Sequence, residues 1–393
     1  MMHLLSEEMR RDPYPLYEQM RGSSPVLNFP GTDMWMLFDY ESVKRAVTDP
    51  EAFSSEVTPP TGKAPDWMIF SDPPRHSNLR TIVLRAFTPR SISALEPRVR
   101  ELSRQLLSRH LERGELDLVG DYSDLLPTLV IAEMLGIPSE DLATFQRWAG
   151  IIMKLSYALT GGEEARRGIA EHAAAKEEMR LYLTDLLAAR RRVPRDDLLT
   201  RLGEAEVDGQ RLSLEDILGF FQLLLLAGTE TTTSTISNAM LCFLDHPEQL
   251  ARLRHEPQLL PSAIEEVLRF RSPTQFVLRE SRREVELHGQ RIPPGQMVLP
   301  MIGAANRDPG HFHEPDRFDI ARNPNPHIGF GHGIHFCLGA ALARLEARVA
   351  LSELLEHFAD FHRPGDETWQ PREGLLVHGP ARLPLRFTRH ASS

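Results

Sequence analysis

The pattern of apolar and polar positions along the chain predicts a mainly helical protein. Apolar residues recur at helical spacing over most of the sequence, and charged residues occupy the positions between them. The predicted helices cover residues 15–21, 40–48, 76–86, 92–112, 124–135, 140–156, 163–192, 214–244, 261–270 and 340–358. Strands of a small sheet are predicted at residues 34–38, 275–280, 284–287, 297–301 and 384–387, with turns at 288–289 and 293–295.

The longest predicted helix starts with a capping signal. Ser213 and Asp216 have the spacing of a capping box, and residues 245–247, which include a proline, are expected to end the helix. A helix over 214–244 is roughly 45 Å long and crosses a whole domain. Its first half, residues 217–227, is almost entirely apolar and is predicted to be buried, but it is too short to span a membrane.

Poor helix formers interrupt this buried helix in the middle. Residues 228–235 consist of one glycine, one glutamate, one serine and otherwise threonine. Such residues compete for the hydrogen bonds of the helix backbone. Local inconsistency of this kind tends to mark a functional site.

A second unusual stretch surrounds one of the two cysteines, Cys337. Gly331 and Gly333 free the backbone there, and the apolar spacing after the cysteine predicts a helix over 340–358. A sulfur at the start of a helix is biased toward thiolate, which is a nucleophile or a metal ligand. The plain alternative is a small buried hydrophobic residue, and this is the preferred interpretation for Cys242, which lies at the apolar end of another helix.

Length, composition and charge narrow the classes of protein. The 393 residues contain no linker, repeat or low-complexity tract, so a single domain over 1–393 is predicted. Two cysteines form no disulfide framework, and no early apolar run or signal peptide is present, so a soluble cytoplasmic protein without membrane contact is expected. The net charge of −10 argues against nucleic acid as a partner. An arginine-rich segment, residues 75–100, is either a docking face for an acidic protein or a solvated helix face.

The stretch around Cys337 carries a family pattern. It contains, at fixed offsets, Phe330, Gly331, Gly333, His335, Cys337 and Gly339. This pattern resembles the haem-ligand loop of the cytochrome P450 family. The resemblance implies a mainly α fold with a small β-sheet region, in which haem b lies between the long central helix and this loop. It further implies that Phe330 and Gly339 contact the haem and that Cys337 is the axial thiolate ligand of its iron.

The same resemblance gives a role to the polar residues of the long helix. Ala227, Gly228, Glu230 and Thr231 look like the oxygen-activation motif of the family, although many members carry Asp at the position of Glu230. Thr231 is the expected hydroxyl and Glu230 the expected acid of a proton-delivery path. Helical spacing places a further set on the face of Thr231, where it is expected to line the substrate pocket. This set is Phe220, Leu224, Ala227 and Gly228.

Charged residues elsewhere match two further family features. Buried haem propionates need cations, and the resemblance assigns this role to His76, Arg80, Arg279 and His335, each of which would on its own be read as a surface charge. Glu266 and Arg269 resemble the family's buried structural pair, with Arg317 as the expected third member. Taken alone, that pair is more simply a solvated helix pair.

Together these features predict a haem-thiolate monooxygenase of secondary metabolism. It is expected to hydroxylate or epoxidise a mainly apolar substrate with O₂, using electrons from a separate ferredoxin and an NAD(P)H-dependent ferredoxin reductase. The electron donor is expected to dock near Arg80, Arg85, Arg344 and Arg348, and the protein is expected to be a monomer. A peroxide-driven oxygenase and a haem-binding sensor or electron carrier are the alternatives.

The substrate pocket is predicted only in outline. The candidate segments are residues 57–70, 148–157, 220–228, 274–277 and 375–378, and they include Gln275, Val277 and His378. They are apolar with scattered polar residues, and no charge cluster requires an ionic ligand. A macrolide, a terpene, a steroid and a fatty acid all remain open as substrates.

Overall fold

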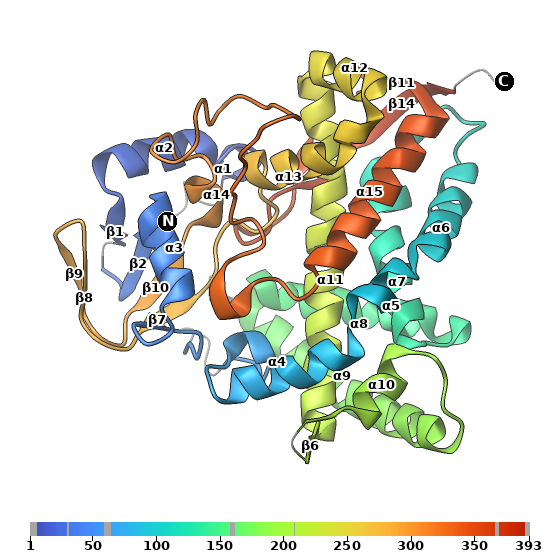
Figure 1. The fold of residues 1–393 in the computed structure, drawn as a ribbon, viewed down its shortest axis with the longest axis horizontal. Coiled ribbons are helices and arrows are strands. Elements are labelled where there is room, and N and C mark those ends of the chain that lie inside the picture. Colours follow the sequence, from blue (N-terminus) through green and yellow to red (C-terminus); the bar gives the residue numbers. More distant parts are fainter. Residues whose placement is uncertain are drawn as a thin grey trace.

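The computed structural model describes residues 6–29, 31–58, 64–157, 162–207, 209–365 and 369–389, with the side chains of 156–157 and 162–165 excepted. Helices dominate it, as the sequence predicts, and the largest sheet lies to one side (Figure 1). The helices are α1 Glu7–Arg11, α2 Tyr14–Ser23, α3 Tyr40–Thr48, α4 Arg75–Ala86, α5 Pro89–Ser93, α6 Glu96–Ser108, α7 Leu125–Leu135, α8 Leu142–Tyr157, α9 Gly162–Arg192, α10 Leu198–Glu204, α11 Leu214–Asp245, α12 Pro247–His255, α13 Leu260–Phe270, α14 Ile302–Ala305 and α15 Ala340–His357.

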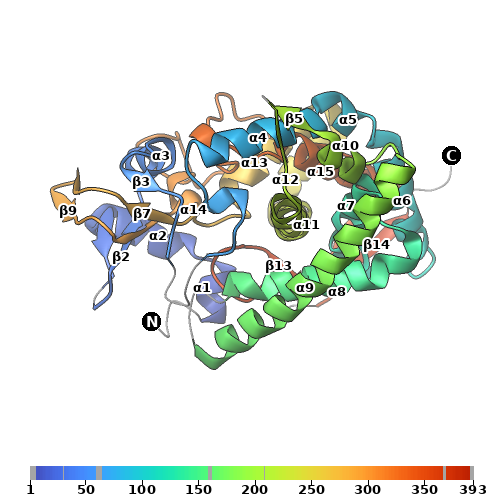
Figure 2. The ribbon, with the colours of Figure 1, turned by 90° about the horizontal axis from the view of Figure 1, so that it is seen from below.

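Helix α11 is the centre of the helical part. It runs through the molecule in Figure 1 and is seen end-on among the other helices in Figure 2. The predicted capping box is confirmed, because the backbone N–H of Asp216 donates to Ser213 Oγ at 3.1 Å and the backbone N–H of Ser213 donates to Asp216 Oδ2 at 3.0 Å. Helices α7, α8, α9, α13 and α15 pack against α11 and share with it the largest hydrophobic core.

The strands form one five-stranded sheet and several smaller ones. They are β1 Val26–Asn28, β2 Met34–Leu37, β3 Phe53–Ser54, β4 Glu115–Asp117, β5 Glu206–Val207, β6 Gln210–Arg211, β7 Arg279–Ser281, β8 Val285–Leu287, β9 Gln290–Ile292, β10 Met297–Pro300, β11 Phe358–His362, β12 Gln370–Pro371, β13 Pro380–Arg382 and β14 Pro384–Arg389. The large sheet has the order β1-β2-β10-β7-β3, and within it only the β2–β10 pair is parallel. In Figure 1 this sheet lies with α2, α3 and α14 on the side of the molecule away from α6 and α10.

Two predicted elements differ from the structure. The helix predicted over 92–112 is divided into α5 and α6, because Pro97 in the first turn of α6 cannot continue a preceding helix. The strand predicted over 275–280 pairs in the sheet only from Arg279 onward. In its first part, the N–H of Gln275 donates to the carbonyl of Leu376 at 2.8 Å and that of Val277 to the carbonyl of Pro300 in β10 at 3.3 Å.

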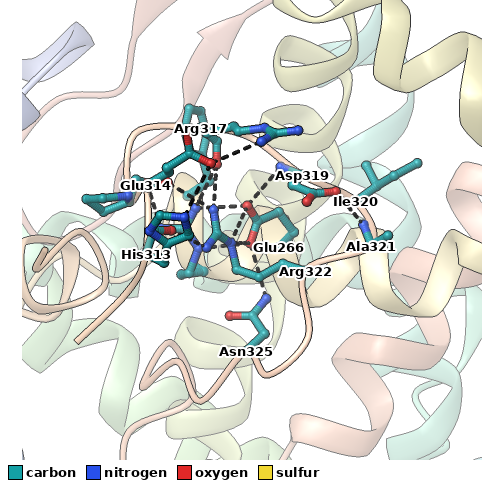
Figure 3. A network of polar contacts seen from close by, with 12 residues as sticks. Glu266, His313, Glu314, Arg317, Asp319, Ile320, Ala321, Arg322 and Asn325 are labelled. Carbon is teal, nitrogen blue, oxygen red and sulfur yellow. Dashed lines mark hydrogen bonds and ion pairs between the residues drawn. The ribbon is translucent and has the colours of Figure 1, made fainter.

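A buried polar network braces the segment that leads to Cys337 (Figure 3). Glu266 and Arg269 of α13 are both fully buried, and Arg269 donates two hydrogen bonds of 2.8 Å to Glu266. The third member is Arg322, whose Nε lies 3.1 Å from both oxygens of Glu266. Arg322 also donates to three backbone carbonyls, those of His313, Glu314 and Arg317.

Arg317 therefore does not take the position that the sequence suggested for it. Its side chain is 60% exposed and pairs with Glu314 at 3.0 Å, whereas the side chain of Arg322 is 11% exposed. Arg317 contributes its backbone carbonyl, which accepts from Arg269 and Arg322. The chain turns after Arg317, and this turn brings the later arginine back onto Glu266. Sequence spacing alone could not distinguish the two.

Replacement of Arg322 tests the network. Arg322→Ala leaves the carboxylate of Glu266 with one cation fewer in the interior, so it should lower the free energy of unfolding by about 3 kcal/mol. Arg317→Ala removes an exposed pair and should change it by about 0.5 kcal/mol or less. Urea unfolding of the two variants measures both values, and equal losses would contradict the assignment.

Candidate functional site

The loop before Cys337 is shaped by two left-handed glycines. Gly331 and Gly333 have φ angles of +70° and +69°, which residues with a side chain rarely adopt. A Cβ at Gly333 would also lie 3.1 Å from the carbonyl oxygen of Val47 in α3. The backbone N–H of Cys337 donates to the carbonyl of Phe330 at 2.9 Å, and α15 begins three residues later. The loop thus presents the sulfur in a fixed place at the start of a helix.

Burial opposes ionisation of the Cys337 thiol. Burial raises its pKa, and this outweighs the opposing effects of the Gly339 backbone N–H, Arg80 and Arg344. The backbone N–H of Gly339 at the helix start favours the thiolate, as predicted, but this effect is smaller than the opposing effect of burial. A thiolate here needs a stronger positive charge nearby, such as a metal ion bonded to the sulfur.

In the middle of α11, one turn is exposed although the turns on either side of it are buried. Residues 217–225 and 232–243 are buried, whereas Leu226, Gly228 and Thr231 are partly exposed and Ala227 is exposed. This turn is therefore accessible to a ligand or to water, whereas the turns on either side are covered. The hydroxyl of Thr231 donates to the carbonyl of Ala227 at 2.7 Å, which satisfies it within the helix.

Gly228 takes a different place from its neighbours. A Cβ on it would lie 2.8 Å from Cδ1 of Ile131 in α7, so this glycine allows close packing of the two helices. Phe220 and Leu224 are buried members of the main core. Ala227 and Thr231 are therefore the residues of the motif that face the open space.

Four basic side chains from separate parts of the chain come together near the Cys337 loop. They are His76 and Arg80 from α4, Arg279 from β7 and His335 from the loop. The rings of His76 and His335 lie 4.1 Å apart between centroids. His76 is 1% exposed, and neither of its ring nitrogens has a hydrogen-bond partner in the structure.

Burial and neighbouring positive charges both act against protonation of the histidines in this cluster. Burial lowers the pKa of His335 to about 3, with further lowering by Arg279 and His76. Burial lowers the pKa of Arg279 to about 10. Buried basic groups without partners call for an anion. A ligand with carboxylates on one edge, such as a haem, fits these four residues together with the Cys337 sulfur.

A buried acid that sequence reasoning missed, Asp72, organises this cluster. It accepts hydrogen bonds from the Ser55 N–H at 3.0 Å, from the Ser54 hydroxyl and from Arg282. The hydroxyl of Ser55 in turn lies 2.9 Å from Nε2 of His335. Asp72 precedes the two prolines before His76, but nothing in that local sequence points to its distant partners.

Three other predicted pocket residues, Gln275, Val277 and His378, have contacts of their own in the structure. Gln275 is buried and donates to the carbonyl of Ser272 at 2.6 Å, and Val277 packs with the sheet core. The ring of His378 contacts the Arg11 carbonyl at 3.1 Å and the ring of Tyr14. Of the candidate pocket segments, residues 59–63 lie outside the described residues, as do the side chains of residues 156 and 157.

Near its start, α11 is contacted by α9 and by the segment that precedes α4. Gln222 Oε1 accepts from Trp67 Nε1 at 3.2 Å and lies 3.0 Å from Nε2 of His172 in α9. A Cβ on Gly219 would lie 2.7 Å from the carbonyl oxygen of Asp66, so the segment before α4 rests directly on α11. In the sequence, only the polar Gln222 within the apolar first half of α11 indicates this contact.

Glu230 is the most unusual group of the site. It is buried, and neither carboxyl oxygen has a hydrogen-bond partner in the structure. Burial raises its pKa to about 7, Arg372 acts to lower it, and Asp124 acts to raise it. An acid with a pKa near neutrality both gives and takes protons at physiological pH.

The comparisons with known proteins agree with this site. Residues 163–385 match the family model described as Cytochrome P450. The chain is 41% identical to Cytochrome P450 107B1 of Saccharopolyspora erythraea, over 91% of this chain and 90% of the relative. It is 39% identical to a Vitamin D(3) 25-hydroxylase of Pseudonocardia autotrophica, over 97% and 95%. The crystal structure of substrate-free CYP109E1 from Bacillus megaterium matches with a TM-score of 0.90 at 36% identity, covering 97% of this chain and 100% of that one.

The chain belongs to the cytochrome P450 family, and the predicted fold class is confirmed. It is an oxidoreductase of the monooxygenase type, a class that carries haem with thiolate ligation and whose bacterial members use redox partners. Within the described part of the chain, no helix has the length and apolar character required to cross a membrane.

The titration of Glu230 makes a testable difference to stability. Its folded-state pKa of about 7 lies above the ordinary value of 4.5, so the ionised carboxylate destabilises the fold once the pH exceeds both values. Glu230→Gln should therefore raise the free energy of unfolding by about 3 kcal/mol well above pH 7. The gain should vanish below pH 4.5, where the carboxyl is protonated in both states.

Urea unfolding of the haem-loaded protein across this pH range measures the effect. Glu356→Gln, at an exposed position of α15, is the matched control and should follow the wild type at every pH. A constant difference between Glu230→Gln and the wild type would contradict the raised pKa.

Proposed function

We propose that this chain is a haem b monooxygenase that oxidises a mainly apolar substrate by hydroxylation or epoxidation. The observation that carries the proposal is the buried cluster of His76, Arg80, Arg279 and His335 beside the Cys337 loop, in which the ring nitrogens of His76 lack partners. Cys337 would bind the iron, and the four basic groups would hold the propionates. When bound, the haem supplies the activation of O₂ and the transfer of one oxygen atom to the substrate.

The residues of α11 would control protons and water on the other side of the cavity. The hydroxyl of Thr231 lies on the exposed turn and can hold a water molecule while it donates to the Ala227 carbonyl. Glu230, the preceding residue, would supply protons to that water, since burial holds its pKa near 7. An acid that supplies protons beside an alcohol that holds water supports O₂ as the oxidant, because a peroxide-driven enzyme needs no such supply of protons.

The electrons would come from a separate ferredoxin and an NAD(P)H-dependent ferredoxin reductase. The surface near Cys337 supports docking of an acidic protein. Arg80 donates from Nη2 to the carbonyl of Phe336 at 2.7 Å, and the side chains of Leu84 and Phe336 are exposed apolar groups. The predicted contributions of Arg344 and Arg348 are reduced, because these residues pair with Glu265 and Glu96. Arg80 and Arg85 therefore remain the stronger candidates.

Names and titles of relatives suggest the first substrates to try. CYP109E1 from Bacillus megaterium was crystallised with testosterone and with corticosterone, and one relative of this chain is a cyclomarin C epoxidase. Another matching structure carries hexadec-9Z-enoic acid on an acyl carrier protein. We infer that the substrate is a large, mainly apolar molecule, and we choose testosterone, corticosterone, vitamin D(3) and a free C16 fatty acid as the panel. Displacement of water from the iron, seen as a shift of the Soret band, identifies binders.

The spectrum of the reduced protein with carbon monoxide tests the ligand of the iron. Thiolate ligation by Cys337 should give the Soret band at the long wavelength typical of haem-thiolate proteins. Cys337→Ser should lose this band, whereas Cys242→Ser, at the buried second cysteine, should keep it. A histidine-type spectrum for the wild type would overturn the assignment of Cys337.

Replacement of Thr231 tests the proton path. Thr231→Ala should leave binding of the panel compound unchanged and divert at least about half of the consumed electrons into hydrogen peroxide, because proton delivery is slowed by about tenfold or more. Thr235→Ala, one turn further along α11 and buried, is the matched control. Product and peroxide measured per NAD(P)H consumed decide the outcome, and unchanged coupling would remove Thr231 from the path.

A further inference from the structure

The buried acid Glu230 faces a part of the fold that is far from α11 in sequence. Arg372 lies just after β12, and its Nη1 is 3.9 Å from Oε1 of Glu230. On the same face of α11, a Cβ at Gly379 would lie 2.8 Å from Oγ of Ser234, one helical turn after Glu230. The segment between β12 and β13 therefore covers this face of the helix.

Arg372 is bonded to a second carboxylate, which reaches the solvent. Its Nη2 donates to Asp124 Oδ1 at 2.7 Å, and the side chain of Asp124 is 45% exposed whereas that of Arg372 is 7% exposed. Nε of Arg372 has no hydrogen-bond partner. One guanidinium group thus stands between an acid at the surface and an acid in the interior.

The backbone of Arg372 is fixed, so its side chain is the part that can move. The N–H of Arg372 donates to the carbonyl of Gly379 at 2.9 Å, and its own carbonyl accepts from Arg10 Nη1 at 2.8 Å. A gap of 3.9 Å is about 1 Å longer than a charge-assisted hydrogen bond. A small rotation of the side chain would close this gap and weaken the contact with Asp124.

The charged groups that act on Glu230 from the packed elements are Arg372, from the end of β12, and Asp124, from the start of α7. The hydroxyls of Ser123, which precedes Asp124, and of Ser234, one helical turn after Glu230, have no hydrogen-bond partner. An ionised carboxylate buried without a partner costs several kcal/mol. When Glu230 loses its proton, its carboxylate therefore attracts the guanidinium group of Arg372 strongly. This attraction ends when the proton returns.

We propose that Arg372 is a positioning residue that exchanges its guanidinium group between Asp124 and Glu230 and thereby controls the return of protons from the solvent to Glu230. The inference rests on the proposed function, in which Glu230 supplies protons next to Thr231. While Glu230 is protonated, Arg372 stays on Asp124. When Glu230 has given its proton to water at Thr231, Arg372 moves to the new carboxylate and releases Asp124.

Water that reaches the released Asp124 then brings a proton from solvent. Transfer of this proton inward, through water and the Ser123 and Ser234 hydroxyls, protonates Glu230 and sends Arg372 back to Asp124. One proton leaves Glu230 toward the cavity and one enters from the solvent in each cycle, so charge and atoms balance. Arg372 itself never loses a proton, since a guanidinium group stays charged at working pH.

Crystal structures of the haem-loaded protein on either side of the Glu230 pKa of about 7 test the exchange directly. Well below this pH, Arg372 should keep its 2.7 Å contact with Asp124. Well above it, the Nη1 to Oε1 distance should shorten from 3.9 Å to hydrogen-bond length. Glu230→Gln should hold Arg372 on Asp124 at both pH values. An arginine that stays on Asp124 in every structure would overturn the proposal.

Infrared titration of the Glu230 carboxyl gives a second test that needs no turnover. Arg372→Gln should raise the titration midpoint by about one unit, and Asp124→Asn, which frees Arg372 for Glu230, should lower it by about one unit. Arg372→Lys should retain a midpoint close to that of the wild type. Arg382→Gln, which removes an exposed arginine of β13 that pairs with Asp117, is the control and should cause no shift. Shifts in the same direction for Arg372→Gln and Asp124→Asn would contradict the sharing of one guanidinium group.

The coupling of electron use to product connects this exchange to the reaction. With the panel compound that the protein oxidises, Arg372→Gln should lower product turnover by about tenfold, less than the hundredfold typical for loss of a proton donor itself. KM should stay unchanged, and the pH profile of coupling should shift in the same direction as the infrared midpoint of each variant. A coupling profile that does not follow the infrared midpoint would refute the role of Arg372. Unchanged coupling in Thr231→Ala would instead remove Thr231 from the path, and the infrared and crystallographic tests of Arg372 do not depend on that result.

Discussion

Burial of charge is the constraint on which the rest of this structure depends. The interior contains the Glu266, Arg269 and Arg322 network, the basic cluster of His76 and its neighbours, and the lone acid Glu230. These groups differ in how completely their charge is compensated. The network around Glu266 is fully bonded and only braces the chain. In the other two, His76 and Glu230 have side-chain atoms without a hydrogen-bond partner, although Glu230 lies 3.9 Å from Arg372.

The long helix α11 links these charged sites with the hydrophobic core. Its buried turns hold the surrounding helices, and its single exposed turn at Ala227 and Thr231 opens onto the cavity. Glu230 lies in that turn but faces away from it, toward Arg372. A helix can separate two neighbouring residues in this way because successive side chains point about 100° apart. One turn therefore presents an alcohol to the cavity and an acid to a route from the surface.

The helix caps and the glycine-rich loop could be predicted from the sequence, because each depends on a few residues that are close together in the chain. The capping box at Ser213 and the glycines before Cys337 were both found from spacing alone. What could not be predicted depends on contacts between distant segments. The choice of Arg322 over Arg317 follows from a turn in an irregular segment, and the contacts of Asp72 join residues that no periodicity relates. The bias of Cys337 toward thiolate was overestimated for a similar reason, since burial by distant elements opposes it.

The contact between Gly333 and α3 bears on when the site comes into existence. The cysteine loop rests on the carbonyl of Val47, and the basic cluster joins residues of α4 and β7 to His335. A ribosome makes the first of these segments long before the last. Contacts between residues so distant in sequence form late in folding, because the entropy cost of closing a long loop comes before these contacts contribute any stabilisation. A haem site built on these residues would therefore be complete only after most of the chain has been synthesised.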